Sequence, residues 1–129
     1  KLAFYKYQGT GNDFIIIDNR KLKVKLNTDQ IAHLCNRRFG IGADGVLLVS
    51  AATDPSTAAR MRVVNADGSK PEMCGNGLRC VALFVARESG MRSGTLRIET
   101  DAGVRSCEGC QPSRRLARPL SSALTRLGP

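Results

Sequence analysis

The sequence predicts an α+β fold in which a mixed, mostly antiparallel sheet curls around one central apolar helix. Short segments typical of strands outnumber helical segments, and most of them follow one another without a helix between them. One longer run, at residues 78–86, is apolar on nearly every side, so we expect a helix that is buried all round. The chain has 129 residues, 42% of them hydrophobic, and is long enough for one domain with its own core.

The expected elements follow from local patterns taken in chain order. Alternation of apolar and polar residues, or a short apolar run, predicts strands at five places. These are Leu2–Tyr7, Phe14–Asp18, Gly45–Ser50, Arg60–Val64 and Leu96–Thr100. A helix is expected from Thr28, a favourable N-cap, to about Arg38, because apolar residues recur there on one face. Asn65–Ser69 is a strong turn signal between the fourth strand and the central helix.

Cys74 stands at the start of the apolar helix, just before Gly75 and Asn76, and Gly90 gives that helix a C-terminal stop. Unpaired backbone N–H groups and the positive end of the helix dipole favour a thiolate there, and the thiolate is the form that acts as a base or nucleophile. The same N–H groups are able to bind a substrate carboxylate. A buried structural cysteine at a helix start has the same local pattern, so these residues alone leave both interpretations open.

The composition changes beyond about Arg105. From Cys107 to Pro129 the chain has no Val, Ile, Lys or aromatic residue, and Arg, Ser, Leu, Gly and Pro dominate. Leucines at helical spacing occur there, but Pro119 interrupts the pattern. We therefore expect one domain at residues 1–105 and an atypical, poorly ordered tail at residues 106–129.

The net charge of +9 raises the question of nucleic acid. The basic residues are scattered, and neither an aromatic platform nor a recognition motif accompanies them. We expect a solvated surface and no nucleic-acid partner, and a small basic nucleic-acid-binding module is kept as an alternative. A charged surface of this kind also attracts an acidic or zwitterionic small substrate.

Five cysteines without the spacing of a disulfide framework indicate free thiols in a reducing compartment. Cys107 and Cys110 form a C-x-x-C pair, but no second pair exists, and the only histidine, His33, is far upstream. We therefore expect these residues to serve neither a metal site nor redox chemistry. The longest apolar runs are too short to span a bilayer, and the N-terminus lacks the apolar region of a signal peptide. These features predict no membrane association and a cytoplasmic location.

Four motifs in a fixed order carry a resemblance to a known family. They are Gly9-Thr10-Gly11-Asn12-Asp13-Phe14, Phe39-Gly40-Ile41-Gly42-Ala43-Asp44-Gly45, Asn65-Ala66-Asp67-Gly68-Ser69 and Met73-Cys74-Gly75-Asn76-Gly77. With them the chain resembles the N-terminal half of the diaminopimelate epimerases over about residues 2–103. The resemblance implies two similar α/β domains that face each other across a cleft, each with a sheet curled around a central helix. It also implies a cofactor-independent enzyme of bacterial and plant lysine biosynthesis that interconverts L,L- and meso-diaminopimelate.

The resemblance further implies a mechanism with two cysteines, one from each domain, on opposite faces of the substrate α-carbon. One thiolate removes the α-proton, and a thiol returns a proton to the other face. Cys74 matches the cysteine of the first domain. Gly75 and Asn76 match positions that hold the substrate at the helix start, while Asn12 and Asn65 match residues that hydrogen-bond its amino-acid groups. For these four residues, turn formation and capping are the structural alternatives.

Two kinds of departure from the family accompany the resemblance. Gly45 stands where many members carry Gln, and Lys70 stands where an acidic residue is common. The family's second domain brings its cysteine in a glycine-rich loop, and nothing of that kind follows Gly103. We expect this chain to carry only the first half of the site, with a catalytically inactive truncated fragment as the alternative. The face that the second domain covers in the family is expected to favour self-association.

Overall fold

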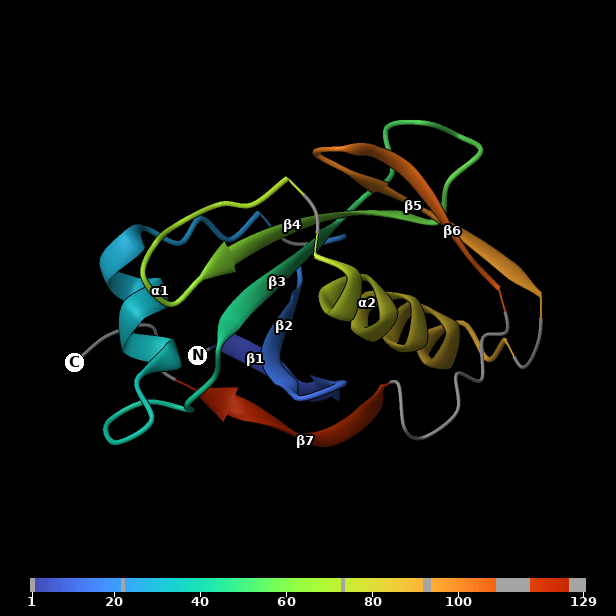
Figure 1. Cartoon of the computed structure of the whole chain (residues 1–129). Helices are drawn as coiled ribbons and strands as arrows, with labels where there is room; N and C mark the ends of the chain where they lie inside the picture. Colours follow the sequence, from blue (N-terminus) through green and yellow to red (C-terminus); the bar gives the residue numbers. More distant parts are fainter. Residues whose placement is uncertain (1, 22, 73, 92–93, 109–116, 126–129) are drawn as a thin grey trace.

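A computed structural model describes residues 2–21, 23–72, 74–91, 94–108 and 117–125 of the chain (Figure 1). Strands and helices share these ranges, and the α+β class expected from the sequence is confirmed. The elements are β1 (Leu2–Gly9), β2 (Asn12–Asp18), α1 (Thr28–Cys35), β3 (Gly45–Ser50), β4 (Ala59–Asn65), α2 (Gly75–Glu88), β5 (Thr95–Thr100), β6 (Gly103–Glu108) and β7 (Arg118–Thr125). No helix within the described ranges is long and apolar enough to cross a membrane.

The strands of the described ranges form one twisted sheet in the order β6-β5-β4-β3-β2-β1-β7. The pairs β2–β3 and β4–β5 are parallel, and every other neighbouring pair is antiparallel. The mixed, mostly antiparallel sheet predicted from the sequence is therefore confirmed. Each parallel pair is joined by a helix, because parallel neighbours need a crossover connection: α1 joins β2 to β3, and α2 joins β4 to β5.

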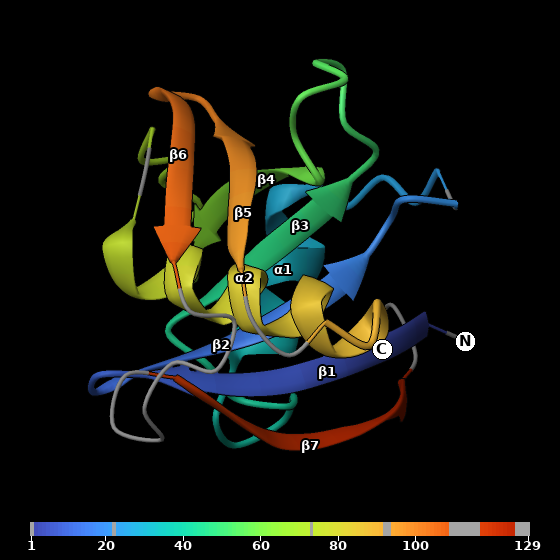
Figure 2. The ribbon, with the colours of Figure 1, turned by 90° about the vertical axis from the view of Figure 1, so that its right-hand side faces the viewer.

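The two helices lie on opposite faces of the sheet (Figure 2). The sheet curls around α2, which contacts β1 to β5 and also β7. Alternation along the strands divides the core accordingly, because successive side chains point to opposite faces. Ile16 and Leu47 pack on the α2 face, whereas Ile15 and Val46 pack on the α1 face.

Burial of α2 explains why its sequence is apolar on nearly every side. Cys80, Val81, Phe84 and Ala86 are all fully inaccessible to solvent. The Phe84 ring packs against two tyrosines of β1, with ring centroids 4.8 Å and 6.0 Å apart. The expected central apolar helix is therefore confirmed, and its position inside the curl fixes where its first residue meets the sheet.

The ends of α1 differ from the expected ones. The N-cap is Asn27, and Thr28 is the first helical residue. Asn27 Oδ1 accepts the Gln30 N–H at 2.8 Å, and the Gln30 side chain accepts the Asn27 N–H at 2.9 Å, which forms a capping box. The helix stops at Cys35 because Asn36 turns the chain. The Asn36 side-chain oxygen accepts hydrogen bonds from the backbone N–H groups of Arg38 and Phe39.

The C-terminal segment also differs from the expectation. The expected boundary at Arg105 falls inside β6, and residues 118–125 form a strand where we expected a poorly ordered tail. β7 pairs antiparallel with β1, from Leu2 opposite Thr125 to Gln8 opposite Arg118. Pro119 is accommodated because β7 lies at the edge of the sheet, where one missing N–H is tolerated. Residues 109–116 and 126–129 of the predicted tail lie outside the described residues.

Candidate active site at the start of the central helix

Cys74 is the N-cap residue of α2, with an extended backbone conformation at φ −133° and ψ 116°. Its carbonyl oxygen accepts the Leu78 N–H at 2.8 Å and starts the helix, while its Sγ accepts the Gly77 N–H at 3.5 Å. The side chain is half-buried. The thiol expected at the helix start therefore occupies the capping position itself, in contact with the backbone of the first turn.

Two glycines shape the space around this thiol. A Cβ at Gly77 would lie 2.9 Å from Leu47 Cδ2 and 3.7 Å from Cys74 Sγ, so a larger residue there would require the buried Leu47 side chain to shift. A Cβ at Gly75 would meet nothing within 4 Å. The first backbone N–H groups of a helix have no backbone acceptor within that helix, and the space beside Gly75 is open. A helix start of this kind has the properties of an anion-binding position.

Asn12 and Asn76 join the helix start to the beginning of β2. Asn76 Nδ2 donates a hydrogen bond to Asn12 Oδ1 over 2.5 Å. Asn76 Oδ1 in turn accepts a hydrogen bond from Arg79 Nη1 over 3.0 Å. The structure therefore brings together four of the five site residues predicted from the sequence, namely Asn12, Cys74, Gly75 and Asn76.

Asp44, in the loop before β3, holds the other side of Asn12. Its Oδ2 accepts hydrogen bonds from Asn12 Nδ2 at 3.1 Å and from the Asp13 backbone N–H at 3.2 Å. Arg37 donates to both carboxylate oxygens of Asp13, at 2.9 and 2.8 Å, and to Asp44 Oδ1 at 3.0 Å. The Arg37 guanidinium, together with Lys6, holds the pKa of Asp13 well below its ordinary range.

Asn65, the fifth predicted residue, ends β4 at the same end of the sheet as Asn12. Asn65 pairs with Gly45 of β3, and Gly45 pairs with Phe14, two residues after Asn12 in β2. The Asn65 side chain donates to Ser69 Oγ at 2.9 Å, which is the turn-forming role considered as the alternative. A Cβ at Gly45 would lie 3.4 Å from Asn65 Oδ1, so the absence of a side chain at residue 45 leaves room beside this amide.

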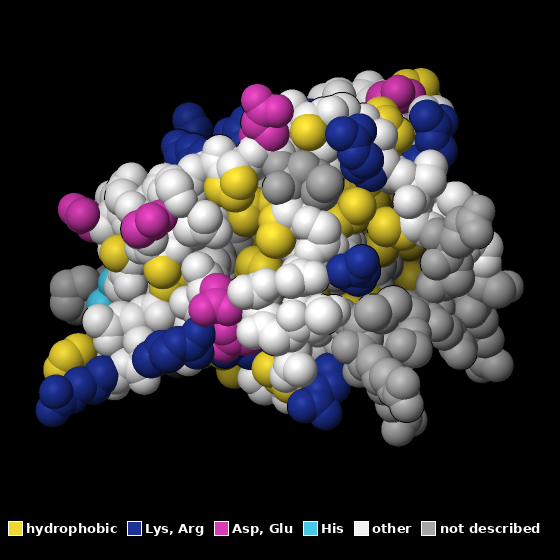
Figure 3. Space-filling model, in the orientation of Figure 1, with side chains coloured by type: hydrophobic (Ala, Val, Ile, Leu, Met, Phe, Trp, Pro, Cys, Tyr) yellow, Lys and Arg dark blue, Asp and Glu magenta, His cyan; other side chains and the backbone are white. Residues whose placement is uncertain are grey.

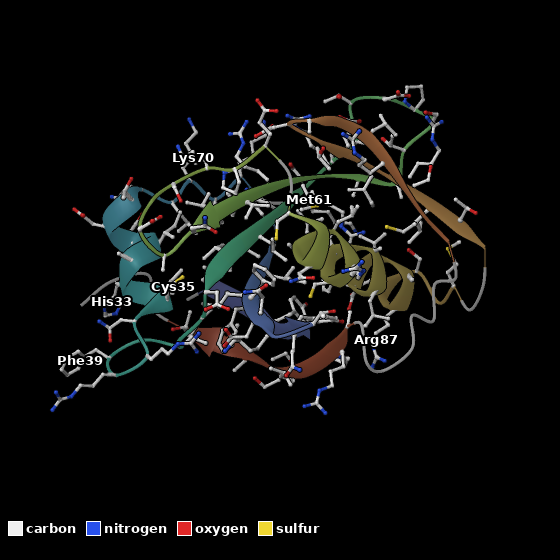
Figure 4. All side chains as sticks on the ribbon, viewed as in Figure 1. His33, Cys35, Phe39, Met61, Lys70 and Arg87 are labelled. Atoms are coloured by element: carbon white, nitrogen blue, oxygen red, sulfur yellow. The ribbon has the colours of Figure 1, made fainter. Side chains whose placement is uncertain are left out.

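The other cysteines of the described ranges lie in different settings. Cys80 is fully buried inside α2, and burial raises the pKa of its thiol to about 12. Cys35 is buried on α1, where burial raises its thiol pKa to about 11. Figure 4 places Cys35 and His33 on α1, away from α2. Cys107 is half-buried on β6, and Cys110 lies outside the described residues. No group of three or more His, Cys, Asp or Glu in the described part of the chain is arranged to hold a metal ion.

Sequence reasoning missed Asp44, Arg79 and Arg37 as members of this cluster. Asp44 was in view as part of a family motif, but nothing local indicates that it faces Asn12 across 32 positions. Arg79 follows Asn76 by three residues on a helix, a spacing at which side chains are neighbours. That spacing was a usable signal for the Arg79 contact, whereas the Arg37 contacts depend on the tertiary fold.

Comparison with known proteins adds the family. The profile of the family described as "Diaminopimelate epimerase" matches residues 4–117. Diaminopimelate epimerase of Synechocystis sp. is 52% identical over 104 residues, which are 80% of this chain and 37% of that protein. The chloroplastic diaminopimelate epimerase of Oryza sativa subsp. japonica is 48% identical over 105 residues, 80% of this chain and 29% of that protein. The chain thus spans about a third of the length of these curated relatives.

Solved structures of lower identity share the fold. A hydroxyproline epimerase from Agrobacterium vitis is 15% identical with a TM-score of 0.62, covering 81% of this chain and 36% of that one. A methylitaconate-delta-isomerase is 14% identical with a TM-score of 0.64, covering 83% of this chain and 59% of that one. At these identities the likeness concerns the fold alone, whereas the sequence matches identify the family. The chain belongs to the diaminopimelate epimerase family, a family of isomerases.

Proposed function

We propose that this chain supplies the first half of an active site that epimerises diaminopimelate, with Cys74 as one of two acid/base thiols. The observation that carries the proposal is the capping position of Cys74, whose Sγ lies against the first turn of α2 beside the open space at Gly75. Family membership supports the substrate and the reaction class.

The chemistry asks two things of the site. The α-hydrogen of an amino acid is weakly acidic, so its removal needs a positioned base and stabilisation of the charge that develops toward the carboxylate. In the proposed step the Cys74 thiolate takes the α-proton and becomes a thiol, while the electron pair of the broken C–H bond spreads into the substrate carboxylate. The N–H groups at the start of α2 are suited to stabilise that carboxylate.

Inversion needs a second proton donor on the opposite face of the α-carbon. Among the described cysteines, Cys35 and Cys80 are buried with raised thiol pKa values, which disfavours them for this role. The family resemblance assigns the second thiol to a second domain. We propose that the two halves together epimerise the substrate, and that the half described here on its own exchanges the α-proton without inversion.

The three asparagines are proposed as substrate-binding residues with Gly75. Asn76 and Asn12 are tied together at the helix start, and Asn65 lies at the same end of the sheet. Lysine biosynthesis, in which the family's reaction takes part, and a cytoplasmic location belong to the same proposal.

Isotope exchange tests the proposal directly. The purified chain is incubated with L,L-diaminopimelate in heavy water, and α-deuteration and meso product are followed by mass spectrometry and chiral separation. We expect α-deuteration that is lost in Cys74→Ser and retained in Cys107→Ser, a matched substitution at another half-buried thiol. Deuteration that persists in Cys74→Ser, or its absence in the unmodified chain, would contradict the proposed role of this half-site.

Self-association is a second part of the proposal. Figure 3 shows hydrophobic side chains at the surface in the region that α2 and β5 occupy in Figure 1. Exposed apolar patches favour association. We expect sedimentation velocity to show a concentration-dependent dimer, and a single monomeric species across the concentration range would contradict this expectation.

A further inference from the structure

We infer that Asp44 and Arg79 are positioning residues that fix which way round the carboxamides of Asn12 and Asn76 lie. The four residues Arg79, Asn76, Asn12 and Asp44 form a continuous row of hydrogen bonds, called the relay below. The functional consequence rests on the proposed function, whereas the orientation itself follows from the hydrogen bonds.

The relay runs in one direction from donor to acceptor. Arg79 Nη1 donates to Asn76 Oδ1 at 3.0 Å. Asn76 Nδ2 donates to Asn12 Oδ1 at 2.5 Å, and Asn12 Nδ2 donates to Asp44 Oδ2 at 3.1 Å. Each amide therefore gives one hydrogen bond toward Asp44 and receives one from the side of Arg79.

The central pair has no preferred direction of its own. A carboxamide carries both a donor and an acceptor, and its NH₂ and C=O ends have similar shapes. If Asn12 and Asn76 both turned over, one N–H···O hydrogen bond would still join them, only with the opposite polarity. The contact between the two asparagines therefore does not decide the orientation.

The two charged ends of the relay decide it. The Asp44 carboxylate only accepts hydrogen bonds, and the Arg79 guanidinium only donates them. In the reversed arrangement Asn12 Oδ1 would face a carboxylate oxygen, and the Asn76 NH₂ group would face a guanidinium N–H. Both ends would lose a charge-assisted hydrogen bond and gain a repulsive contact, so one orientation satisfies all three links.

Arg37 and Asp13 hold the Asp44 end in place. Asp44 has a side chain that is 41% exposed, but its Oδ1 accepts from Arg37 and its Oδ2 accepts from the Asp13 backbone N–H. The Asp44 backbone N–H donates to the Asp13 carbonyl oxygen at 3.0 Å. The acceptor at the end of the relay is thus fixed by contacts other than the one to Asn12.

The orientation determines what the site offers to a ligand. Each carboxamide NH₂ carries two hydrogens, and the relay uses one from each asparagine. The relay does not use the second N–H of Asn76 Nδ2, and under the proposed function this N–H donates to a substrate oxygen. Without the charged ends, either the N–H or the C=O of the Asn76 carboxamide would face the ligand. A carboxylate ligand accepts a hydrogen bond from the N–H but is repelled by the C=O.

Hydrogen-bond scalar couplings measure the direction without any need for activity. In a 13.9 kDa protein labelled with ¹⁵N and ¹³C, we expect a coupling between Asn76 Nδ2 and the side-chain carbonyl carbon of Asn12, and none in the reverse sense. In the double variant Asp44→Asn/Arg79→Gln both ends become carboxamides that accept or donate. In this variant we expect the coupling from Asn76 Nδ2 to the Asn12 carbonyl carbon to fall to about half. A reverse coupling, from Asn12 Nδ2 to the Asn76 side-chain carbonyl carbon, should appear, as for two orientations of equal stability.

The matched control removes the same charges from an ion pair at the other end of β2. Asp18→Asn/Arg20→Gln breaks the bidentate pair of Arg20 with Asp18 and is expected to leave the coupling unchanged. A reverse coupling in the unmodified protein, no coupling in either sense, or an unchanged coupling in the Asp44/Arg79 variant would overturn the inference.

Binding of diaminopimelate separates this inference from the proposed function. By calorimetry we expect the Kd of the Asp44→Asn/Arg79→Gln variant to be about tenfold higher than that of the unmodified protein. The single variant Arg79→Lys keeps Asp44 and a donor-only end, so it should retain most of the affinity of the unmodified protein. The expected coupling without any diaminopimelate binding in the unmodified protein would support the orientation and contradict the proposed function. Binding that is equally tight in the double variant would contradict the functional part of the inference.

Discussion

Asn76 Nδ2 lies 2.5 Å from Asn12 Oδ1 although 64 positions separate the two residues in the sequence. This contact joins the start of the central helix, whose N-cap is Cys74, to the start of β2. Two of the four family motifs therefore meet at one hydrogen bond. The contact is the link through which the sheet positions the proposed substrate-binding residues.

Removal of the Asn12 side chain is expected to destabilise the protein. Asn12→Ala leaves Asn76 Nδ2 and Asp44 Oδ2 without this partner, and a lost hydrogen bond of this kind costs about 1 kcal/mol in the free energy of unfolding. Urea unfolding measures the change. Asn36→Ala is the control, because it removes a carboxamide that lies away from Cys74. The Asn36 side chain accepts two backbone N–H groups in the loop after α1. Asn36→Ala should leave ligand binding intact, and equal loss of ligand binding in both variants would contradict the local role of Asn12.

The two phenylalanines at positions 84 and 39 provide a matched test of the core. Phe84 is fully buried, whereas Phe39 is 73% exposed and projects from the loop after α1, at the far side of the molecule (Figure 4). Phe84→Ala is expected to lower the free energy of unfolding by about 3–5 kcal/mol, as for large core truncations. Phe39→Ala should change it by less than about 0.5 kcal/mol. Similar effects of the two substitutions on urea unfolding would show that α2 is not the centre of the core.

The N-terminal glycines of α2 should respond in opposite ways to alanine. Gly77→Ala places a methyl group 2.9 Å from Leu47 Cδ2 in the core and is expected to cost about 1–3 kcal/mol by overpacking. Gly75→Ala points a methyl group into open space and should be neutral or stabilising, because alanine favours the helix by up to about 1 kcal/mol. Thermal unfolding measures both, and a more stable Gly77→Ala protein would contradict the close approach of α2 to β3.

Acid should weaken the attachment of the loop between β3 and β4. The Asp54 backbone N–H and the Thr53 side chain donate to the buried Glu99 carboxylate at 2.5 and 2.6 Å, and they lower its pKa from 4.5 to about 2. A carboxyl group with a depressed pKa in the folded state stabilises the fold above its unfolded pKa. That contribution is lost as the pH falls from about 4.5 through about 2.

A pH series of unfolding free energies checks this prediction. Glu99→Gln removes the titrating group, so the difference between the unmodified protein and the variant should be largest near neutral pH and should shrink below pH 4.5. Glu72→Gln, at an exposed glutamate, is the control and should show no such trend. A difference between Glu99→Gln and the unmodified protein that stays constant down to pH 2 would contradict the role of the Glu99 charge.

The fold was predictable from the sequence where side-chain burial leaves a pattern. Gly45–Ser50 and the apolar helix match their expected positions because each is buried against several neighbours. β7 was not predictable, since its side chains from Arg118 to Leu124 are all exposed, and an edge strand of this kind has no apolar alternation. Asn27, the true cap of α1, precedes an equally suitable Thr28, and only the Gln30 contact distinguishes them.

The site divides in the same way between local and tertiary information. The thiol at the start of α2 follows from the local sequence, because an N-cap and the residues after it are adjacent in the chain. Asp44 and Arg37 approach Asn12 and Asp13 only after β2, α1 and β3 have assembled. No periodicity indicates such contacts, so the polar cluster beside Cys74 had to be found in the structure.

Competitive alkylation of the native protein tests the central claim most directly, namely that Cys74 is the thiol that faces the substrate. Iodoacetamide is added to the folded chain with and without L,L-diaminopimelate, and the modified cysteines are identified by peptide mass spectrometry. We predict that Cys74 is alkylated while the buried Cys35 and Cys80 are spared, and that diaminopimelate, but not lysine, slows the reaction of Cys74. Alkylation of Cys74 at the same rate with and without diaminopimelate would contradict the claim.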